Sequence, residues 1–268
     1  MAGIKFQKIK LPKLKWPGKP RQKTSKKTSS KEKKVHPWRL CPLGQYWVRT
    51  HPMHVPPSKK NPAGSVTSRK GHCAKNPTRK DQLYPDEILE ITTKHFPKVR
   101  KLPCSIDLKF LNGSSYDLFI AGWTQYWNEV LKPEISLDPN LIKALISSES
   151  GFDPEILANK KDSNSARGLL QITNATRKIL GNEKGELREN YITVTKEDLN
   201  NPNINICTGI RWLFHKQKLA SARLRRNASW EEAVFEYKGG RSTSSSRANE
   251  LMDKFREYLL KLEICIKK

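Results

Sequence analysis

The sequence contains no run of 18 or more apolar residues, so no segment of it is predicted to cross a membrane as a helix. Residues 1–15 carry five lysines and no continuous apolar stretch, so they do not read as a secretory signal peptide. The five cysteines are an odd number without a Cys-x-x-Cys pair, and a disulfide framework is not indicated. These absences argue against a membrane protein and against a small disulfide-rich fold.

Acidic residues are almost missing from the first part of the chain. Residues 1–80 hold 22 Lys and Arg but a single acidic residue, Glu32, whereas residues 81–268 hold 29 basic and 25 acidic residues. The first part also holds ten of the seventeen prolines and few branched aliphatic residues, so it cannot bury a large core. We therefore expect a basic disordered tail over residues 1–35, a small module over 36–80, and a globular domain over 81–268.

The basic tail has two possible roles. Residues 4–16 alternate apolar and basic side chains, and Pro12 argues against a continuous helix. Such a segment suits an anionic partner, which would be a membrane surface, an anionic wall polymer or nucleic acid. The alternative is a solvated basic arm that binds nothing.

Residues 36–80 read as a β-hairpin module. Residues 45–53 and 64–73 have a β-type composition, and a turn-rich segment that begins at Pro57 joins them. The module also holds enough soft ligands for zinc, although their spacing matches no standard zinc finger: Cys41, His51, His54, His72 and Cys73. Three alternatives stay open for these residues: a zinc site, a disulfide between Cys41 and Cys73, or neither.

From Tyr84 onward the chain is predicted to be helical. Apolar periodicity and end signals indicate helices over residues 86–96, 116–131, 139–150, 173–180, 203–220, 229–238 and 247–264. The aromatic residues of the second helix are interpreted as core, and Cys207 and Cys265 are interpreted as buried thiols on apolar helix faces. The predicted fold class is mainly α.

One acidic side chain breaks the apolar pattern. In the helix that Asp138 is expected to cap, a helical projection places Glu149 in the middle of the apolar face, with Lys143, Ser147 and Ser150 directed toward water. Burial and the negative end of the helix dipole would both raise the pKa of this carboxyl, and a protonated Glu can act as a general acid. The alternative is a helix-end Glu that turns outward or finds a basic partner.

The sequence around Glu149 resembles the lytic transglycosylases of the soluble type. Those enzymes carry a Glu-Ser-x-x-x-Pro block, a Gly-Leu-Met-Gln block and an Ala-Tyr-Asn-Gly-Gly block in this order. Here the three blocks are Glu149 to Pro154, Gly168 to Gln171, and Glu236 to Gly240. The resemblance covers roughly residues 115–245 and implies a lysozyme-like helical domain of the goose-type or transglycosylase kind, without a cofactor.

The resemblance also implies a role for each matching residue. Glu149 would be the catalytic acid and base, while Ser150, Gln171 and Tyr237 would contact the substrate and Leu170 would line the cleft in place of the usual Met. Lys238 replaces the usual Asn, which removes whatever hydrogen bond that Asn makes to sugar. The loop from Glu155 to Ser165 looks longer than usual and would reshape one end of the cleft.

The implied reaction is cleavage of the β-1,4 bond between N-acetylmuramic acid and N-acetylglucosamine in peptidoglycan, with a 1,6-anhydro product. A hydrolytic muramidase that uses Asp153 or Asp162 as its base stays open, as does a non-catalytic glycan-binding module with a polyanion-binding tail. The site of action would be the bacterial cell wall or periplasm. Without a signal peptide, we expect delivery by another route, such as a secretion or phage apparatus, or synthesis in the cytoplasm.

Overall fold

The computed structural model describes residues 38–42, 44–75, 82–240 and 245–266, so the tail predicted over residues 1–35 lies outside the described residues. Residues 35–268 form one compact unit. Within the described residues there are seven α-helices and three two-stranded sheets, which confirms the mainly α prediction. None of the described helices is long and apolar enough to cross a membrane.

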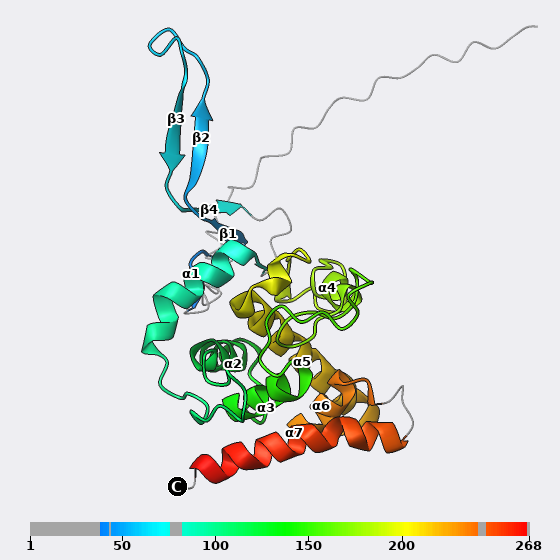
Figure 1. Ribbon diagram of the computed structural model, residues 1–268. Helices are drawn as coiled ribbons and strands as arrows, with labels where there is room; N and C mark the ends of the chain where they lie inside the picture. Colours follow the sequence, from blue (N-terminus) through cyan, green and yellow to red (C-terminus); the bar gives the residue numbers. More distant parts are fainter. Residues whose placement is uncertain (1–37, 43, 76–81, 241–244, 267–268) are drawn as a thin grey trace, which may run out of the picture. The chain divides into compact units, whose positions relative to one another are not determined.

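The helical elements follow a β-rich N-terminal part (Figure 1). The helices are α1 (Pro85–His95), α2 (Asp117–Leu131), α3 (Pro139–Glu149), α4 (Asn174–Leu180), α5 (Pro202–Leu224), α6 (Trp230–Tyr237) and α7 (Ser245–Ile266). Short 3-10 helices occupy Phe96–Lys98 and Asp198–Asn200. The strands are β1 (Gln45–Val48), β2 (His51–Val55), β3 (Ser65–Arg69), β4 (His72–Lys75), β5 (Gln82–Leu83) and β6 (Tyr191–Ile192).

The core forms around α2 and α5, which pack against each other. Trp123, Tyr126 and Trp127 of α2 are at most 1% exposed, so their interpretation as core residues is confirmed. The indole N–H groups of the two tryptophans find acceptors on α5, because Trp123 donates to Asn203 Oδ1 at 2.6 Å and Trp127 donates to the Cys207 carbonyl at 3.0 Å. The large α2 aromatics therefore bury apolar area without leaving an unpaired donor.

The predicted helix starts are confirmed by their caps. Asp138 Oδ1 accepts from the backbone N–H of Asn140 at 2.8 Å, with Pro139 in the first helical position. Thr173 caps α4 in the same way. Ser229 and Glu232 form the expected capping box at the start of α6. Local side-chain chemistry therefore sets where these three helices begin.

The prediction that the polar face of α3 meets water is wrong. Lys143 is 0% exposed, Ser147 is 5% exposed, and Ser150 is 8% exposed. The Lys143 ammonium lies 2.8 Å from Asp117 and donates to the Cys104 carbonyl at 2.8 Å. Two segments distant in sequence cover this face: the loop before α2, and α7, which packs along α3 (Figure 1).

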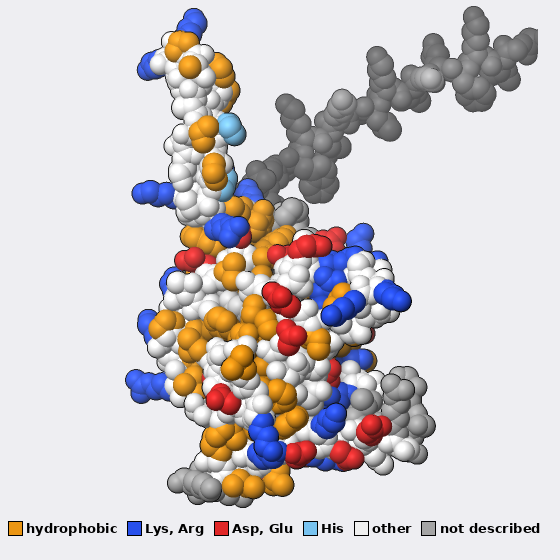
Figure 2. Space-filling view, in the orientation of Figure 1, with side chains coloured by type: hydrophobic (Ala, Val, Ile, Leu, Met, Phe, Trp, Pro, Cys, Tyr) orange, Lys and Arg blue, Asp and Glu red, His pale blue; other side chains and the backbone are white. Residues whose placement is uncertain are grey.

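The predicted hairpin is present, in two sections. β1 pairs antiparallel with β4, and β2 continues the ladder antiparallel with β3, with a turn around Ser58 and Asn61. Figure 2 shows this hairpin with basic and apolar side chains and no acidic ones. Every residue of β3 is exposed. Whether residues 36–80 form a module separate from residues 81–268 stays a prediction.

A disulfide joins the two sides of the hairpin base. Cys41 and Cys73 are bonded, with a Cα–Cα distance of 5.6 Å that is ordinary for a disulfide. Bonded sulfurs are not thiolates, so the zinc alternative for Cys41 and Cys73 is overturned. Within the described part of the chain, no group of three or more His, Cys, Asp and Glu side chains is arranged to hold a metal.

The segment before the hairpin packs on the helical part. Trp38 is 8% exposed and belongs to the main core, where its ring contacts Phe96 and Tyr126. Arg39 forms a buried ion pair of 2.6 Å with Glu87 of α1. Burial raises the pKa of Glu87, and the Arg39 guanidinium opposes that shift. These contacts anchor the hairpin base to α1.

The interpretation of Cys265 as a buried thiol is wrong as well. Cys265 forms a disulfide with Cys104, across a Cα–Cα distance of 6.3 Å. This bond ties the end of α7 to the loop that precedes α2. Cys207, in contrast, is a free buried thiol, as predicted. The sequence left the Cys41–Cys73 disulfide open but did not indicate the Cys104–Cys265 disulfide, because cysteines 161 residues apart in sequence meet only in the folded chain.

Candidate active site

Glu149 stands at the last position of α3, where the chain turns sharply. The Ser150 N–H donates to the Ile146 carbonyl at 3.0 Å and closes the last helical turn. Gly151 and Phe152 then both adopt the left-handed conformation, with φ of 60° and 64°. Phe152 is 1% exposed, and its ring packs against Phe110 and Tyr116. The buried ring fixes the turn, and the turn fixes the end of α3 that carries Glu149.

The Glu149 carboxylate is paired with Lys238. Its Oε1 accepts from the Lys238 ammonium at 2.6 Å, and the two side chains are 17% and 5% exposed. The basic partner that the sequence left as an alternative is therefore present. It comes from the third motif block, 89 residues away, and occupies the position where the resembling enzymes have Asn. At this distance the contact is a charge-assisted hydrogen bond.

Tyr237 joins the second and third motif blocks. Its hydroxyl donates to the Leu170 carbonyl at 2.5 Å. Burial raises the pKa of Tyr237 well above its ordinary value, and the nearby negative charge of Glu149 adds to this shift. Tyr237 is therefore a neutral hydrogen-bond donor that holds the segment from Gly168 to Gln171 against the end of α6.

The segment from Gly168 to Gln171 is a tight turn. Gly168 has a φ of 71°, and a Cβ at this position would collide with Asn205. Gln171 also has a positive φ, 45°, and its side-chain amide donates to the Gly168 carbonyl at 2.8 Å. Leu170 is 0% exposed and packs against Gly209, so its side chain supports the turn from inside. Gln171 is half-buried and keeps its amide oxygen without a described partner.

The Ser150 side chain forms a hydrogen bond within the end of α3. Its hydroxyl donates to the Ile146 carbonyl at 3.2 Å, and the residue is 8% exposed. The structure thus brings Glu149, Lys238, Tyr237 and the Gly168–Gln171 turn together. Which of these residues contact a glycan stays a prediction.

Asp153 and Asp162, the candidate second carboxylates, both serve as caps of turns. Asp153 Oδ1 accepts from the Glu155 N–H at 2.9 Å, and Asp162 Oδ1 accepts from the Asn164 N–H at 2.8 Å. Both residues are exposed. An exposed carboxylate that caps a loop turn lacks the burial that prepares a general base.

Sequence reasoning missed Asn205, the residue that organises the turn. Its side chain is 0% exposed, and Oδ1 accepts from the Leu170 N–H while Nδ2 donates to the Arg167 and Leu199 carbonyls. No pattern in the sequence marks it, because α5 is buried on several faces and also buries Asn203, Thr208 and Arg211. A buried amide must find partners, and Asn205 finds them on the motif turn and at the Leu199 carbonyl.

Comparison with known families agrees with this geometry. A family described as the transglycosylase SLT domain matches residues 126–258, which include all three motif blocks. Residues 126–258 belong to the transglycosylase SLT domain family. The match begins in the last part of α2, at residue 126, and ends within α7, at residue 258, so the SLT domain holds Glu149, the Gly168–Gln171 turn, Tyr237 and Lys238. No curated protein matches the chain. The SLT domain family consists of glycan-cleaving transglycosylases whose substrate is peptidoglycan.

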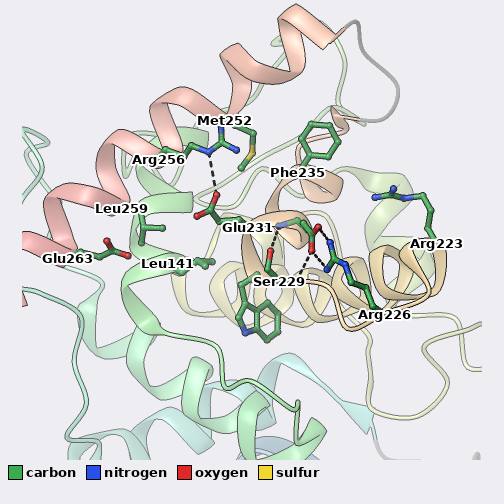
Figure 3. Close-up of a pocket in the computed structure, with 12 residues that line it drawn as sticks. Leu141, Arg223, Arg226, Ser229, Glu231, Phe235, Met252, Arg256, Leu259 and Glu263 are labelled. Atoms are coloured by element: carbon green, nitrogen blue, oxygen red, sulfur yellow. Dashed lines mark hydrogen bonds and ion pairs between the residues drawn. The ribbon is translucent and has the colours of Figure 1, made fainter.

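One pocket of the helical part lies away from Glu149. It has a volume of about 590 Å³ and is lined by residues of α3, α6, α7 and the end of α5 (Figure 3). Its charged side chains pair with one another, because Arg226 pairs with Glu232 and Arg256 lies 3.4 Å from Glu231. Glu149 and Tyr237 do not line it. This pocket is therefore separate from the three motif blocks around Glu149.

Proposed function

We propose that the chain is a peptidoglycan lytic transglycosylase that cleaves the bond between N-acetylmuramic acid and N-acetylglucosamine, with Glu149 as the single catalytic carboxyl. The observation that carries this proposal is the ion pair between Glu149 and Lys238, because it joins the first and third motif blocks of an SLT domain at one point. The Tyr237–Leu170 hydrogen bond adds the second block. Residues that matter only for packing would not require this convergence of polar groups.

Glu149 would serve in two successive steps. In the first, its carboxyl proton moves to the glycosidic oxygen as the bond to C1 of the muramyl sugar breaks, and the sugar's own N-acetyl group stabilises the positive centre. In the second, the Glu149 carboxylate takes the proton of the C6 hydroxyl while that oxygen bonds to C1. The product is a 1,6-anhydro sugar, and Glu149 regains its proton without a cofactor.

The C6 hydroxyl competes with water in the second step. It is attached to the reacting sugar, so it attacks at a high effective molarity once the ring is held in place. A hydrolytic muramidase would instead need a second carboxylate to activate water. Asp153 and Asp162 are exposed turn caps, which supports the transglycosylase over the muramidase.

The alternative of a non-catalytic glycan-binding module rests on the same surface. An intact Glu149 held by residues from another motif block argues against it, since binding alone needs no acid at that position. We propose that the basic N-terminal part contacts an anionic polymer, a membrane surface or nucleic acid. We also propose that a secretion or phage apparatus delivers the protein. These partners would bring the SLT domain to the cell wall or the periplasm.

The product of a peptidoglycan digest tests the proposal. We expect mass spectrometry to find muramyl ends that are one water lighter than hydrolysed ends. Glu149→Gln should reduce turnover by about 10²- to 10⁴-fold, the usual loss for one general acid–base group. Its amide oxygen can still accept from Lys238, so the fold should be kept.

The matched control is Glu250→Gln, which makes the same change at an exposed position of α7 and should leave turnover unchanged. Reducing ends in the wild-type digest would favour the muramidase. Full activity of Glu149→Gln would remove Glu149 from the mechanism.

A further inference from the structure

Lys238 is a buried cation with one described partner. Its side chain is 5% exposed, and one of its three N–H donors goes to Glu149. Within the described residues the ammonium makes no second hydrogen bond. A buried ammonium normally needs its donors satisfied, because desolvation otherwise costs more than a single pair returns. The site is therefore short of an acceptor next to the candidate catalytic carboxyl.

The ion pair also opposes the first chemical step. Glu149 must present its carboxyl to the glycosidic oxygen to act as the acid, but its Oε1 is held by the Lys238 ammonium 2.6 Å away. This charge-assisted hydrogen bond must be exchanged before that oxygen can serve the reaction. A substrate that removed the ammonium from Glu149 would lower this barrier.

On the basis of the function proposed above, we propose that Lys238 is a specificity-determining residue that exchanges the Glu149 carboxylate for a carboxylate of the glycan. A glycan carboxylate near the scissile bond would satisfy the free donors of Lys238 and take up its positive charge. Glu149, relieved of its partner, then accepts the proton that the acid step needs. The SLT domain would thus cleave acidic glycans in preference to neutral ones.

The chemistry of the substrate supplies such a group. The muramyl sugar carries a lactyl ether that ends in a carboxylate, and peptide stems carry carboxylates farther from the ring. A neutral Asn, the usual residue at this position in the resembling enzymes, has no charge to exchange. With Lys238 in this position, efficient cleavage requires a negatively charged group on the substrate. That group acts on the reaction by drawing Lys238 away from Glu149.

The test compares three matched glycans with the full chain. The first is peptide-free glycan with free lactyl carboxylates, the second is the same glycan with those carboxylates converted to amides, and the third keeps its peptide stems. We expect the wild type to cleave the first about 10- to 100-fold faster, in kcat/KM, than the second. The third glycan identifies the source: a rate like the first means that stem carboxylates serve as well, and a rate like the second means that the lactyl carboxylate is required.

Two variants separate exchange from a structural role. Lys238→Asn should cleave the first two glycans at nearly equal rates and should cleave the amidated glycan faster than the wild type does. Lys238→Arg keeps the charge and should keep the preference for the free carboxylate. Because the expected Asn effect is a gain on the neutral substrate, loss of folding cannot imitate it.

The proposal is overturned if the wild type cleaves the free and the amidated glycan at equal rates, or if Lys238→Asn keeps the wild-type preference. A wild type that cleaves none of the three glycans, or a Glu149→Gln variant with full activity, contradicts the proposed function instead. The two failures are therefore distinguishable.

Discussion

Asn205 and Leu170 are joined by a hydrogen bond of 2.8 Å from the Leu170 N–H to the Asn205 side-chain oxygen. Through this bond the long helix α5 holds the turn that carries Gln171. The other side of the same leucine is held by Tyr237, whose hydroxyl donates to the Leu170 carbonyl. The turn is thus held from α5 by a buried hydrogen bond and from α6 by a part-buried one.

The Asn205 contact leads to the first prediction. Asn205→Ala leaves the Leu170 N–H and the Leu199 carbonyl without their partner, whereas the Arg167 carbonyl still accepts from the Ile172 N–H. Each unsatisfied buried group costs about 1–3 kcal/mol, so the variant should lose about 2 kcal/mol or more of unfolding free energy. Urea denaturation measures this loss. Turnover of the folded fraction should also fall, because the turn loses one of its clamps.

Asn205→Asp serves as the comparison for this prediction. It keeps the acceptor for the Leu170 N–H but removes the donors to the Arg167 and Leu199 carbonyls. Its stability should therefore also fall below the wild type. If Asn205→Ala matched the wild type in both stability and turnover, Asn205 would have no role in holding the turn.

The pair formed by Asp117 and Lys143 leads to a prediction on pH. Burial raises the pKa of Asp117 to about 6 from an ordinary value of 3.8, although the Lys143 ammonium opposes the shift. Burial also lowers the pKa of Lys143. A carboxyl with a raised pKa in the folded state binds its proton more tightly there than in the unfolded chain. The contribution of the protonated Asp117 carboxyl to the stability of the folded state is therefore fully present below about pH 4 and is lost as the pH rises through 6.

The measurement compares the wild type with Asp117→Asn, which does not titrate at this position. The unfolding free energy of the wild type minus that of the variant should fall by about 2–3 kcal/mol between pH 4 and pH 7. Titration of all other groups cancels in the difference. A difference that rises with pH would mean that attraction to Lys143 outweighs the burial of Asp117.

Short-range features of this chain could be predicted from the sequence. The caps at Asp138, Thr173 and Ser229, the aromatic core face of α2 and the position of Glu149 at a helix end all depend on neighbours within a few residues. Periodicity and capping chemistry report such neighbours directly. The family resemblance then added the roles of the motif residues, which periodicity alone would have assigned to packing.

The features that were missed depend on residues far apart in sequence. Lys143 looked solvent-exposed because the helical projection shows only α3, whereas α7 and the loop before α2 cover it. The Glu149–Lys238 pair and both disulfides join positions between 32 and 161 residues apart. A single sequence gives no measure of such distances, so the partner of Glu149 stayed an open alternative and zinc was kept open for Cys41 and Cys73.

The Cys41–Cys73 disulfide leads to the last prediction. It closes a loop of about 32 residues that contains the whole hairpin, and a loop of this length stabilises the closed form by about 3–4 kcal/mol in the chain-entropy description. A two-stranded hairpin is marginal without such support. In the double variant Cys41→Ser, Cys73→Ser, we expect limited proteolysis to cut the hairpin much faster, whereas the helical domain keeps its protease resistance and its glycan-cleaving rate.

The control is Cys104→Ser, Cys265→Ser, which removes the other disulfide and should loosen the end of α7 without exposing the hairpin. Equal cleavage of the hairpin in the wild type and in the Cys41, Cys73 variant would contradict the prediction.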